Sequence, residues 1–475
     1  ILYMVCATAL LSSCHIYTSY DRPEDITTSG LYRDPIAEND TLVSDTTNFG
    51  NLPWREVFTD PQLQSLIETG LKQNTDLQSA ILSIKAAQAP LLAAKLAYVP
   101  ALALSPQGTI SSFDNSKASK TYSLPVTASW EISLFGGLLN AKRGADVAVK
   151  QAKAYKQAVQ TQIIANVANL YYTLLMLDRQ LEITRETAEI LKRNAETMEA
   201  MKNAAMYNIN SAGVEQSKAA YAQVMASIPE IEQSIREVEN SLSTLLGEAP
   251  RHIQRGTIEK QILPSEFSVG IPIQLLSNRP DVKAAEMSLA SAYYNTNSAR
   301  SAFYPQITLS GSAGWTNSAG SAIINPGKFL ATAIGSLTQP LFYHGANIAK
   351  LKMAKAQEEQ AKLSFQQTLL NAGSEVSNAL SLYQKTSEKV ESRQMQVESA
   401  KKASEDTKEL FNLGTSTYLE VLSAQQAYLS AQISQVSDCF DRMQAVVSLY
   451  QALGGVAYAL ARFHLYDIAR LLAQI

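Results

Sequence analysis

The chain repeats its own pattern once, and this duplication limits the folds that it can adopt. Three dipeptides recur in the same order at a spacing of 207 residues: Leu134-Phe135 with Leu341-Phe342, Ala220-Tyr221 with Ala427-Tyr428, and Leu246-Gly247 with Leu453-Gly454. A fourth match places Pro100 opposite Pro305. Anchors that recur in one order predict two structural repeats with the same plan.

Two long helical patterns, separated by a short break, dominate each half. In the first half the pattern runs from about Leu138 to Met206, breaks at YNINSAG and resumes to about Leu246. In the second half it runs from about Ala346 to Asn412, breaks at LGTST and resumes to about Leu453. At 1.5 Å per residue, each longer helix would reach roughly 100 Å. Faces rich in Ala, Ser, Gln and Lys favour a packed coiled coil over membrane-crossing helices.

Segments that alternate polar and apolar residues precede the long helices, and this period of two is typical of strands. The clearest runs from Tyr122 to Phe135, and another follows Pro305. KLAYVPALALSPQGTI, from Lys95, and KFLATAIGSLTQPLF, from Lys328, occupy equivalent places in the repeats. The segment after Pro305 divides into an apolar and a polar set: Ile307, Leu309, Ala313 and Trp315, against Gln306, Thr308, Ser310 and Ser312.

The pattern alone leaves two interpretations of these strands open. An ordinary sandwich strand alternates in the same way. Runs of 10 to 14 residues with aromatic side chains near their ends also fit tilted strands that cross a membrane. Four strands cannot close a barrel alone, and open edges are not tolerated in lipid. A membrane barrel would therefore need several copies of the chain.

Composition excludes several classes of function. Lysine plus arginine (40) nearly balance aspartate plus glutamate (43), for a net charge of −3, so no nucleic-acid partner is expected. The four histidines show no metal-ligand spacing, and no nucleophile–histidine arrangement or glycine-rich phosphate loop is visible. We therefore expect no enzyme activity, no cofactor and no metal site.

The first fourteen residues, ILYMVCATALLSSC, resemble a targeting segment. Residues 1–13 form an apolar run of signal-peptide length that ends in small residues. The sequence Leu11-Ser12-Ser13-Cys14 resembles the lipoprotein box of bacteria, which predicts that Cys14 carries a lipid anchor. Residues 14–53 are polar and are expected to form a lipid-anchored N-terminal arm.

One stretch carries a family resemblance. From Gly270 to Trp315 the chain is similar to the signature of TolC-like outer-membrane efflux proteins, and most of all to the OprM/CusC-type lipoprotein branch. The matching positions are Pro272, Leu275, Leu276, Arg279, Pro280, Asp281, Ala285, Glu286, Ala302, Tyr304 and Pro305. The resemblance extends over about residues 54 to 455, including the Leu-Phe-Gly turn at 134–136.

The resemblance implies a mainly α-helical fold with a transmembrane β-barrel. In such a homotrimer, four strands from each protomer would share a twelve-stranded barrel, continued by a long helical periplasmic tunnel. The repeats would be residues 54–247 and 286–455, with an equatorial linker at 248–285 and a C-terminal tail at 456–475. A mixed equatorial domain would lie near residues 50–90, 248–285 and 456 onwards.

The resemblance also implies a function: an exit duct in the bacterial outer membrane that passively conducts small molecules from the periplasm. Its partners would be a periplasmic adaptor, an inner-membrane pump of the resistance-nodulation-division (RND) type, and outer-membrane lipid. Two alternatives are a duct for type I protein secretion and a soluble periplasmic coiled-coil scaffold. The transported substrate cannot be read from the sequence.

The resemblance places candidate functional residues at the helix breaks. Glu420 stands where many family members carry an acid that rings the periplasmic gate, and Gly213 is its equivalent in the first repeat. The alternative is an exposed helical glutamate with no special role. The expected adaptor-docking tips are Asn210, Gly213, Gly414 and Ser416. Arg279 and Asp281 flank a proline before a helix, which indicates a structural motif with Asp281 near the helix N-terminus.

Overall fold

The computed structural model describes residues 14–26, 30–31, 33, 52–112, 114, 118–204, 210–263, 278–316, 328–339 and 344–455. Residues 1–13, the first three residues (207–209) of the YNINSAG break, the motif positions before 278 and the tail 456–475 lie outside this set. The chain divides into two compact units. The first draws on Ile1–Thr27, Ile81–Tyr155 and Asp281–Thr368, and the second on Thr28–Ala80, Lys156–Pro280 and Leu369–Ile475. None of the helices described is long and apolar enough to cross a membrane.

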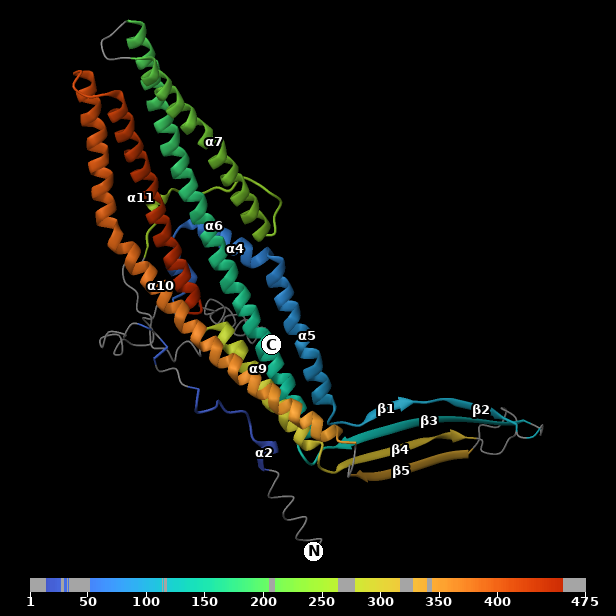
Figure 1. Ribbon diagram of the computed structural model, residues 1–475. Coiled ribbons are helices and arrows are strands. Elements are labelled where there is room, and N and C mark those ends of the chain that lie inside the picture. The colour runs from blue at the N-terminus through green and yellow to red at the C-terminus, as the bar shows by residue number, and fades with distance from the viewer. Residues whose placement is uncertain are drawn as a thin grey trace, which may run out of the picture. The chain divides into compact units, whose positions relative to one another are not determined.

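An antiparallel sheet forms one end of the first unit (Figure 1). Its strands are β1 (Ala101–Leu104), β2 (Gln107–Ser111), β3 (Ser119–Ile132), β4 (Gln306–Thr316) and β5 (Lys328–Thr338). The order is β1-β3-β4-β5, and β2 also pairs with β3. β1 pairs with the second half of β3 and β2 with its first half, so five strands occupy four positions.

The predicted first strand is thus divided into two, β1 and β2, which share one strand position beside β3 in the described sheet. Pro106 lies between β1 and β2 and has no N–H to donate to a ladder. The N–H of Ser105, just before it, donates to the carbonyl of Pro125 at 3.0 Å. A proline at this point therefore interrupts the pairing with β3 without ending it.

β3 also begins and ends earlier than predicted. Instead of Tyr122–Phe135 it spans Ser119–Ile132, and Leu134 and Phe135 lie in a turn. The turn ends at Gly136, whose φ of 76° favours glycine. A Cβ at Gly136 would lie 2.9 Å from the Ile16 side chain, so space also excludes other residues here.

The strand register sorts the side chains onto two faces, because cross-strand partners in an antiparallel sheet share a face. It confirms that the predicted apolar set of β4 lies on one face. Apolar partners on that face are Leu124 with Trp315, Val126 with Ala313, Trp130 with Leu309, and Ile132 with Ile307. Polar partners on the opposite face are Thr127 with Ser312, Ser129 with Ser310, and Glu131 with Thr308.

Residues 14–26 of the N-terminal arm pack into the first unit. It begins with α2 (Cys14–Tyr17), and Ile16 is only 2% exposed. Asn140, on α6 (Gly137–Asn203), donates to the Ile16 carbonyl at 2.9 Å. Further on, Arg22 makes two 2.8 Å bonds to Glu286 of α9 (Pro280–Ser301). Residues 14–26 are therefore a structural part of this unit.

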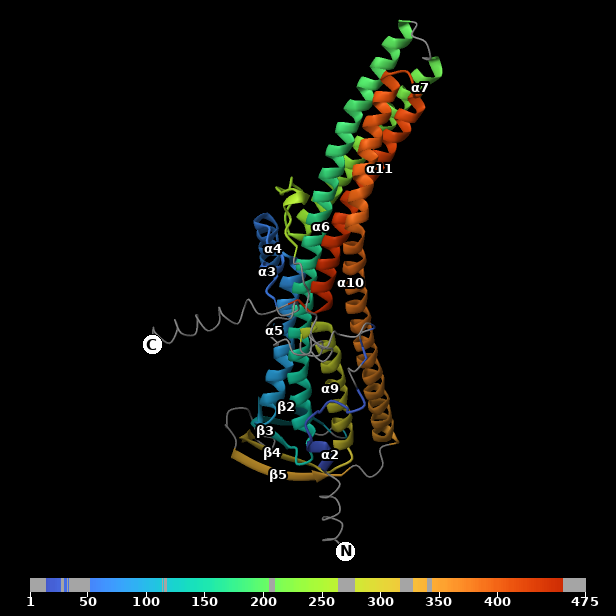
Figure 2. The ribbon, with the colours of Figure 1, turned by 90° about the vertical axis from the view of Figure 1, so that its left-hand side faces the viewer.

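Long helices dominate the rest of the chain and match in length between the repeats. α6 and α10 (Ala346–Asn412) each have 67 residues, and α7 (Ser211–Leu245) and α11 (Tyr418–Ala452) each have 35. α5 (Thr75–Leu96) and α9 each have 22. In the second unit α7 lies beside α6, and α11 beside α10 (Figures 1 and 2). These equal lengths are what a duplicated plan predicts.

The chain that follows each shorter helix passes close to the segment that precedes α5 or α9. Gly247 (φ 75°) follows α7, and Gly454 (φ 99°) follows α11. A Cβ on Gly247 would lie 2.9 Å from the Gln73 carbonyl oxygen. A Cβ on Gly454 would lie 2.8 Å from the Asn278 carbonyl oxygen. Glycine is therefore required at equivalent places in both repeats, by conformation and by space.

Three short helices are also part of the second unit. They are α3 (Trp54–Val57), α4 (Pro61–Gln73) and the 3-10 helix η3 (Ile258–Lys260). Asp60 caps α4 with Pro61 in the first turn and accepts from the Gln62 N–H at 2.8 Å. Its second oxygen accepts from the Tyr171 hydroxyl and the Gln261 amide, both at 2.7 Å. One carboxylate thus ties α4 to α6 and to the segment after η3.

Candidate functional site

Glu420 lies at the start of α11, where it completes a capping box. Thr417 is the N-cap, and the Glu420 carboxylate accepts from the Thr417 N–H at 3.1 Å. The Ser416 hydroxyl donates to the same carboxylate oxygen. Both bonds lower the pKa of the exposed Glu420 carboxyl, and the bond from Ser416 has the larger effect. Glu420 is therefore charged at neutral pH and held close to the helix end.

The sequence already contained the signal for this arrangement. Thr417-Tyr-Leu-Glu420 is the pattern of a capping box, in which the first and fourth residues bond each other's backbone. The expected roles of Glu420 are a gate acid or an exposed glutamate with no special role, and neither includes the capping box. The structure gives it a local structural function that is compatible with a further one.

The start of α7 is built differently from that of α11. Asn210 is its N-cap and accepts from the Gly213 N–H at 2.8 Å. Gly213 is therefore the third residue of α7, as Glu420 is of α11. A Cβ at Gly213 would lie 3.2 Å from the end of Met198. The two repeats thus share the capping position but differ in charge at the third residue.

The end of α10 supplies the other predicted tip. Gly414 has a φ of 76°, and its N–H donates to the Phe411 carbonyl at 3.0 Å. The next N–H, of Thr415, reaches back to Leu410 at 3.0 Å, which completes a Schellman motif. Among the described residues, no atom lies within 4 Å of a Cβ built on Gly414. Its conformation rather than crowding therefore requires glycine.

One apolar cluster connects the starts of α7 and α11 with α6. Its buried members are Leu191, Met198, Val214, Ala220, Tyr418, Val421 and Leu422. Phe411 packs on the edge of this cluster, with its ring 5.9 Å from that of Tyr418 in a T-shaped arrangement. The predicted residues Ser416 and Glu420 are in direct contact, and so are Asn210 and Gly213. The two pairs lie at helix ends joined by this shared core.

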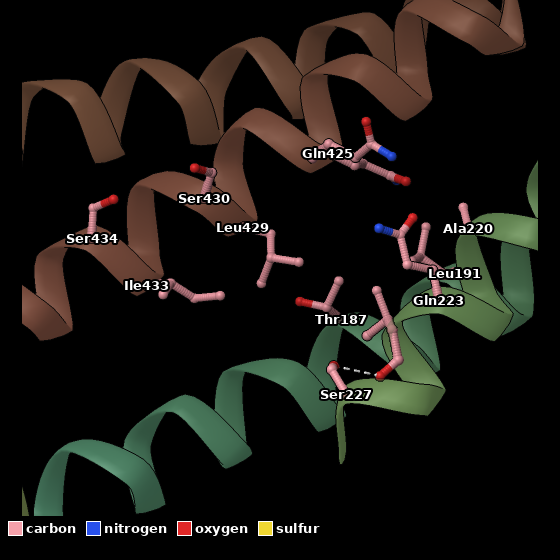
Figure 3. A pocket seen from close by; sticks show the side chains of 12 residues that line it. Thr187, Leu191, Ala220, Gln223, Ser227, Gln425, Leu429, Ser430, Ile433 and Ser434 are labelled. Atoms are coloured by element: carbon pink, nitrogen blue, oxygen red, sulfur yellow. Dashed lines mark hydrogen bonds between the residues drawn. The ribbon is translucent and has the colours of Figure 1, made fainter. Parts of the chain in front are cut away.

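A groove of about 470 Å³ adjoins this cluster and was not predicted from the sequence (Figure 3). Thr187 and Leu191 of α6, Gln223 and Ser227 of α7, and Gln425, Leu429 and Ile433 of α11 line it. The Asn194 amide donates to the Gln425 side chain at 3.0 Å. The lining combines amides and hydroxyls with branched apolar side chains. No group of three or more possible metal ligands occurs in the described parts of the chain.

A buried arginine joins α6 and α7. The Arg255 side chain is 9% exposed and bonds Asp178 of α6 at 2.5 and 2.8 Å. It also bonds Glu239 of α7, which in turn lies 2.8 Å from His252. Burial alone would raise the pKa of Glu239, but the bonds from Arg255 and the Ile253 N–H outweigh it and lower that pKa. This ionic group therefore stabilises the helix pair while Glu239 is charged.

Two parts of the chain match a known protein family. The model of the outer membrane efflux protein family matches residues 66–248 and 271–455, and the chain belongs to that family. The first match contains α6 and α7, and the second contains α10 and α11. The chain is therefore an outer membrane efflux protein.

The curated relatives are named as efflux, export and outer membrane proteins. The chain is 27% identical over 456 residues to the cation efflux system protein CusC of Escherichia coli K12, covering 95% of this chain and 98% of the relative. It is 30% identical over 420 residues to the pyoverdine export outer membrane protein OpmQ of Pseudomonas aeruginosa, covering 85% and 87%. It is 26% identical to the probable outer membrane lipoprotein SilC of Salmonella typhimurium, covering 87% and 90%.

Solved structures agree with the fold. The outer-membrane channel OprN matches with a TM-score of 0.82 at 26% identity, covering 93% of this chain and 99% of that one. CusC matches with a TM-score of 0.81 at 26% identity, covering 92% and 99%. The fold is therefore that of the TolC-like outer membrane channels.

Proposed function

We propose that three copies of this chain assemble and close their sheets into one twelve-stranded barrel in the outer membrane. Each chain supplies four strand positions, and its outer positions, β1/β2 and β5, pair on only one side within the described sheet. Lipid does not tolerate open strand edges, so β5 of one chain must pair with β1/β2 of the next. The apolar sheet face would then meet lipid and the polar face the water-filled lumen.

Exposed apolar side chains on both the sheet and the helices support this assembly. On the apolar sheet face Leu102, Trp130 and Trp315 are exposed in the single chain. The part of α10 in the first unit exposes Ile348, Met353 and Leu363. Exposed apolar side chains of this kind indicate contact with lipid or with a protein partner rather than with water. A second and third copy of the chain would cover the helical ones.

In this assembly the protein is a passive exit duct of a tripartite efflux system. The two-faced sheet, joined to paired helices that recur in both repeats, is the observation that carries this proposal. The helices would continue the barrel as a tunnel in the periplasm. An inner-membrane RND-type pump, coupled through a periplasmic adaptor, would supply the energy for transport. The cargo would be small molecules.

The candidate residues acquire roles in this duct. Three copies of Glu420 near the axis would form an acidic ring at the periplasmic end that repels anions and favours cations. Asn210, Gly213, Gly414 and Ser416 would form the tips on which the adaptor docks. Cys14 would carry the lipid anchor, in agreement with the firm packing of the residues that follow it.

Single-channel recording in planar bilayers tests the proposal, with wild type, Glu420→Gln and Glu420→Ala. Glutamine preserves the capping box, because its side-chain oxygen still accepts from the Thr417 N–H, but it removes the charge. We expect wild-type pores with a cation preference that falls in both variants, and a lower melting temperature only for Glu420→Ala. An absence of wild-type pores would refute the duct. Pores with an unchanged cation preference in Glu420→Gln would refute the gate.

A further inference from the structure

β5 departs from the two-faced pattern of its neighbours. Phe329 and Leu337 lie on the apolar face, opposite Trp315 and Ile307. Leu330 and Ile334 are opposite Gly314 and Ser310, which places them on the polar face. Two large apolar side chains therefore project from a surface that is otherwise built of serine, threonine and glutamine on β4.

Both side chains remain uncovered because their neighbours are small. Leu330 is 53% exposed and Ile334 is 62% exposed. Gly314, beside Leu330, cannot be enlarged, because a Cβ there would collide with the backbone of Leu124 and Pro125 on β3. Thr332, which lies between Leu330 and Ile334 on β5, shares a 2.7 Å hydrogen bond with Ser312. The two apolar residues are four positions apart on one strand, a spacing of roughly 14 Å.

A carboxylate lies on the same face. Glu131 pairs with Thr308, and Thr308 pairs with Ser336 of β5, so these three residues form one row across the sheet. This row is next to the point where β3 leads into α6. The row of Ile334 follows it, and that of Leu330 lies further on. Counted from the end of the sheet that leads into α6, the row of Glu131 therefore comes first, that of Ile334 second and that of Leu330 last.

We propose that Leu330 and Ile334 form an apolar contact site in the wall of the duct that selects amphipathic organic cations among its cargo. The inference rests on the proposed function, in which the polar face lines the lumen. Glu131 attracts the charge of the solute, and the two apolar side chains then contact its hydrocarbon part. A hydrated inorganic ion or a small hydrophilic cation gains nothing from the apolar contact.

Block of single-channel current by tetraphenylphosphonium tests this inference, with tetramethylammonium as the hydrophilic cation. We expect tetraphenylphosphonium to reduce the wild-type current, and Leu330→Ser/Ile334→Ser to need a several-fold higher concentration for the same reduction. Leu337→Ser is the matched control, since Leu337 is an exposed leucine on the other face of the same strand. Glu131→Gln should weaken the effect of both cations on the current, because it removes the charge that attracts them.

The failures of the two proposals can be distinguished. An absence of wild-type pores refutes the duct itself. Working pores that tetraphenylphosphonium blocks equally in wild type and in the double variant refute the contact site, as does an equal loss of block in Leu337→Ser. If the double variant does not form pores, Ile334→Cys in a Cys439→Ser background tests whether position 334 faces the lumen. A water-soluble thiol reagent must then reduce its current, and an unchanged current overturns the inference.

Discussion

Asn74 and Arg279, 205 residues apart, make the same contact in the two repeats. The Asn74 amide donates to the carbonyl of Leu245, at the end of α7, at 2.8 Å. The Arg279 guanidinium donates to the carbonyl of Ala452, at the end of α11, also at 2.8 Å. Each side chain thus satisfies a carbonyl that the helix end leaves without an intrahelical partner.

The two contacts differ in charge. Arg279 is 5% exposed and also bonds the Glu375 carboxylate of α10 at 2.7 Å. Asn74 instead accepts from the N–H groups of Asp76 and Leu77 and so caps α5. The arginine of the Arg-Pro-Asp motif is thus a structural residue, as expected. Asp281 lies in the first turn of α9, where a negative charge is favourable.

Loss of either contact should destabilise the second unit. We expect Arg279→Met to cost about 2 to 3 kcal/mol and Asn74→Ala about 2 kcal/mol, because each leaves a helix-end carbonyl unsatisfied and removes a second interaction. Thermal unfolding followed by circular dichroism in detergent measures the effect. Asn74→Asp keeps the cap but loses the donor, so its melting temperature should be intermediate. Equal melting temperatures for Arg279→Met and Glu375→Gln would contradict the assignment.

The ionic group around Arg255 predicts a loss of stability in acid. The pKa of Glu239 is lower in the folded chain than its ordinary value of 4.5. Its contribution is therefore complete above that value and is lost as the pH falls through the folded pKa. Between pH 7 and 3 the melting temperature of wild type should fall more steeply than that of Glu239→Gln. Glu237→Gln, on the same helix but outside the group, should keep the wild-type slope.

Gly314 should be indispensable for assembly of the sheet. Gly314→Ala places a methyl group against the backbone of β3, which forces β3 and β4 apart. We expect a severe loss of protein from the outer-membrane fraction and of the proposed trimer on size exclusion. Gly335→Ala is the control, because a Cβ there makes only a 3.4 Å contact with the end of Leu309. Normal yields of Gly314→Ala would show that the strands can separate at this point.

The orientation of the sheet can be checked by cysteine labelling in a Cys439→Ser background. Ser310→Cys lies on the polar face and Leu309→Cys on the apolar face. In cells or proteoliposomes, a water-soluble thiol reagent should modify position 310 and leave position 309 unmodified. The reverse pattern would place the polar face away from the lumen and would refute the assignment of both faces.

Local signals explain what could be predicted from the sequence. The bounds of α10, Ala346–Asn412, agree with prediction to the residue, because Gly345 (φ 77°) precedes the helix and Gly414 ends it. The faces of β4 were also predictable, since a period of two depends only on neighbouring residues. The division at Pro106 was missed because it depends on how the strand pairs with β3.

Contacts between distant parts of the chain could not be predicted. Arg279 meets Glu375 and Ala452, which lie 96 and 173 residues later, and its own neighbours suggest only a helix start. The polar sequence of residues 14–53 predicted only a lipid-anchored arm. The burial of Ile16 depends on a space that Gly136 leaves open. At the candidate site, the capping box was readable, whereas the groove along α11 requires three helices to be placed together.

The difference between Gly213 and Glu420 has a consequence for stoichiometry. In an assembly of three chains, the two repeats would present six helix ends around the axis, alternating between a neutral and an acidic kind. The walls would then approach sixfold symmetry while the charge keeps threefold symmetry. A partner that docks on every tip would have to accept two chemically different surfaces. A partner that recognises only one kind would bind in the same number as the subunits.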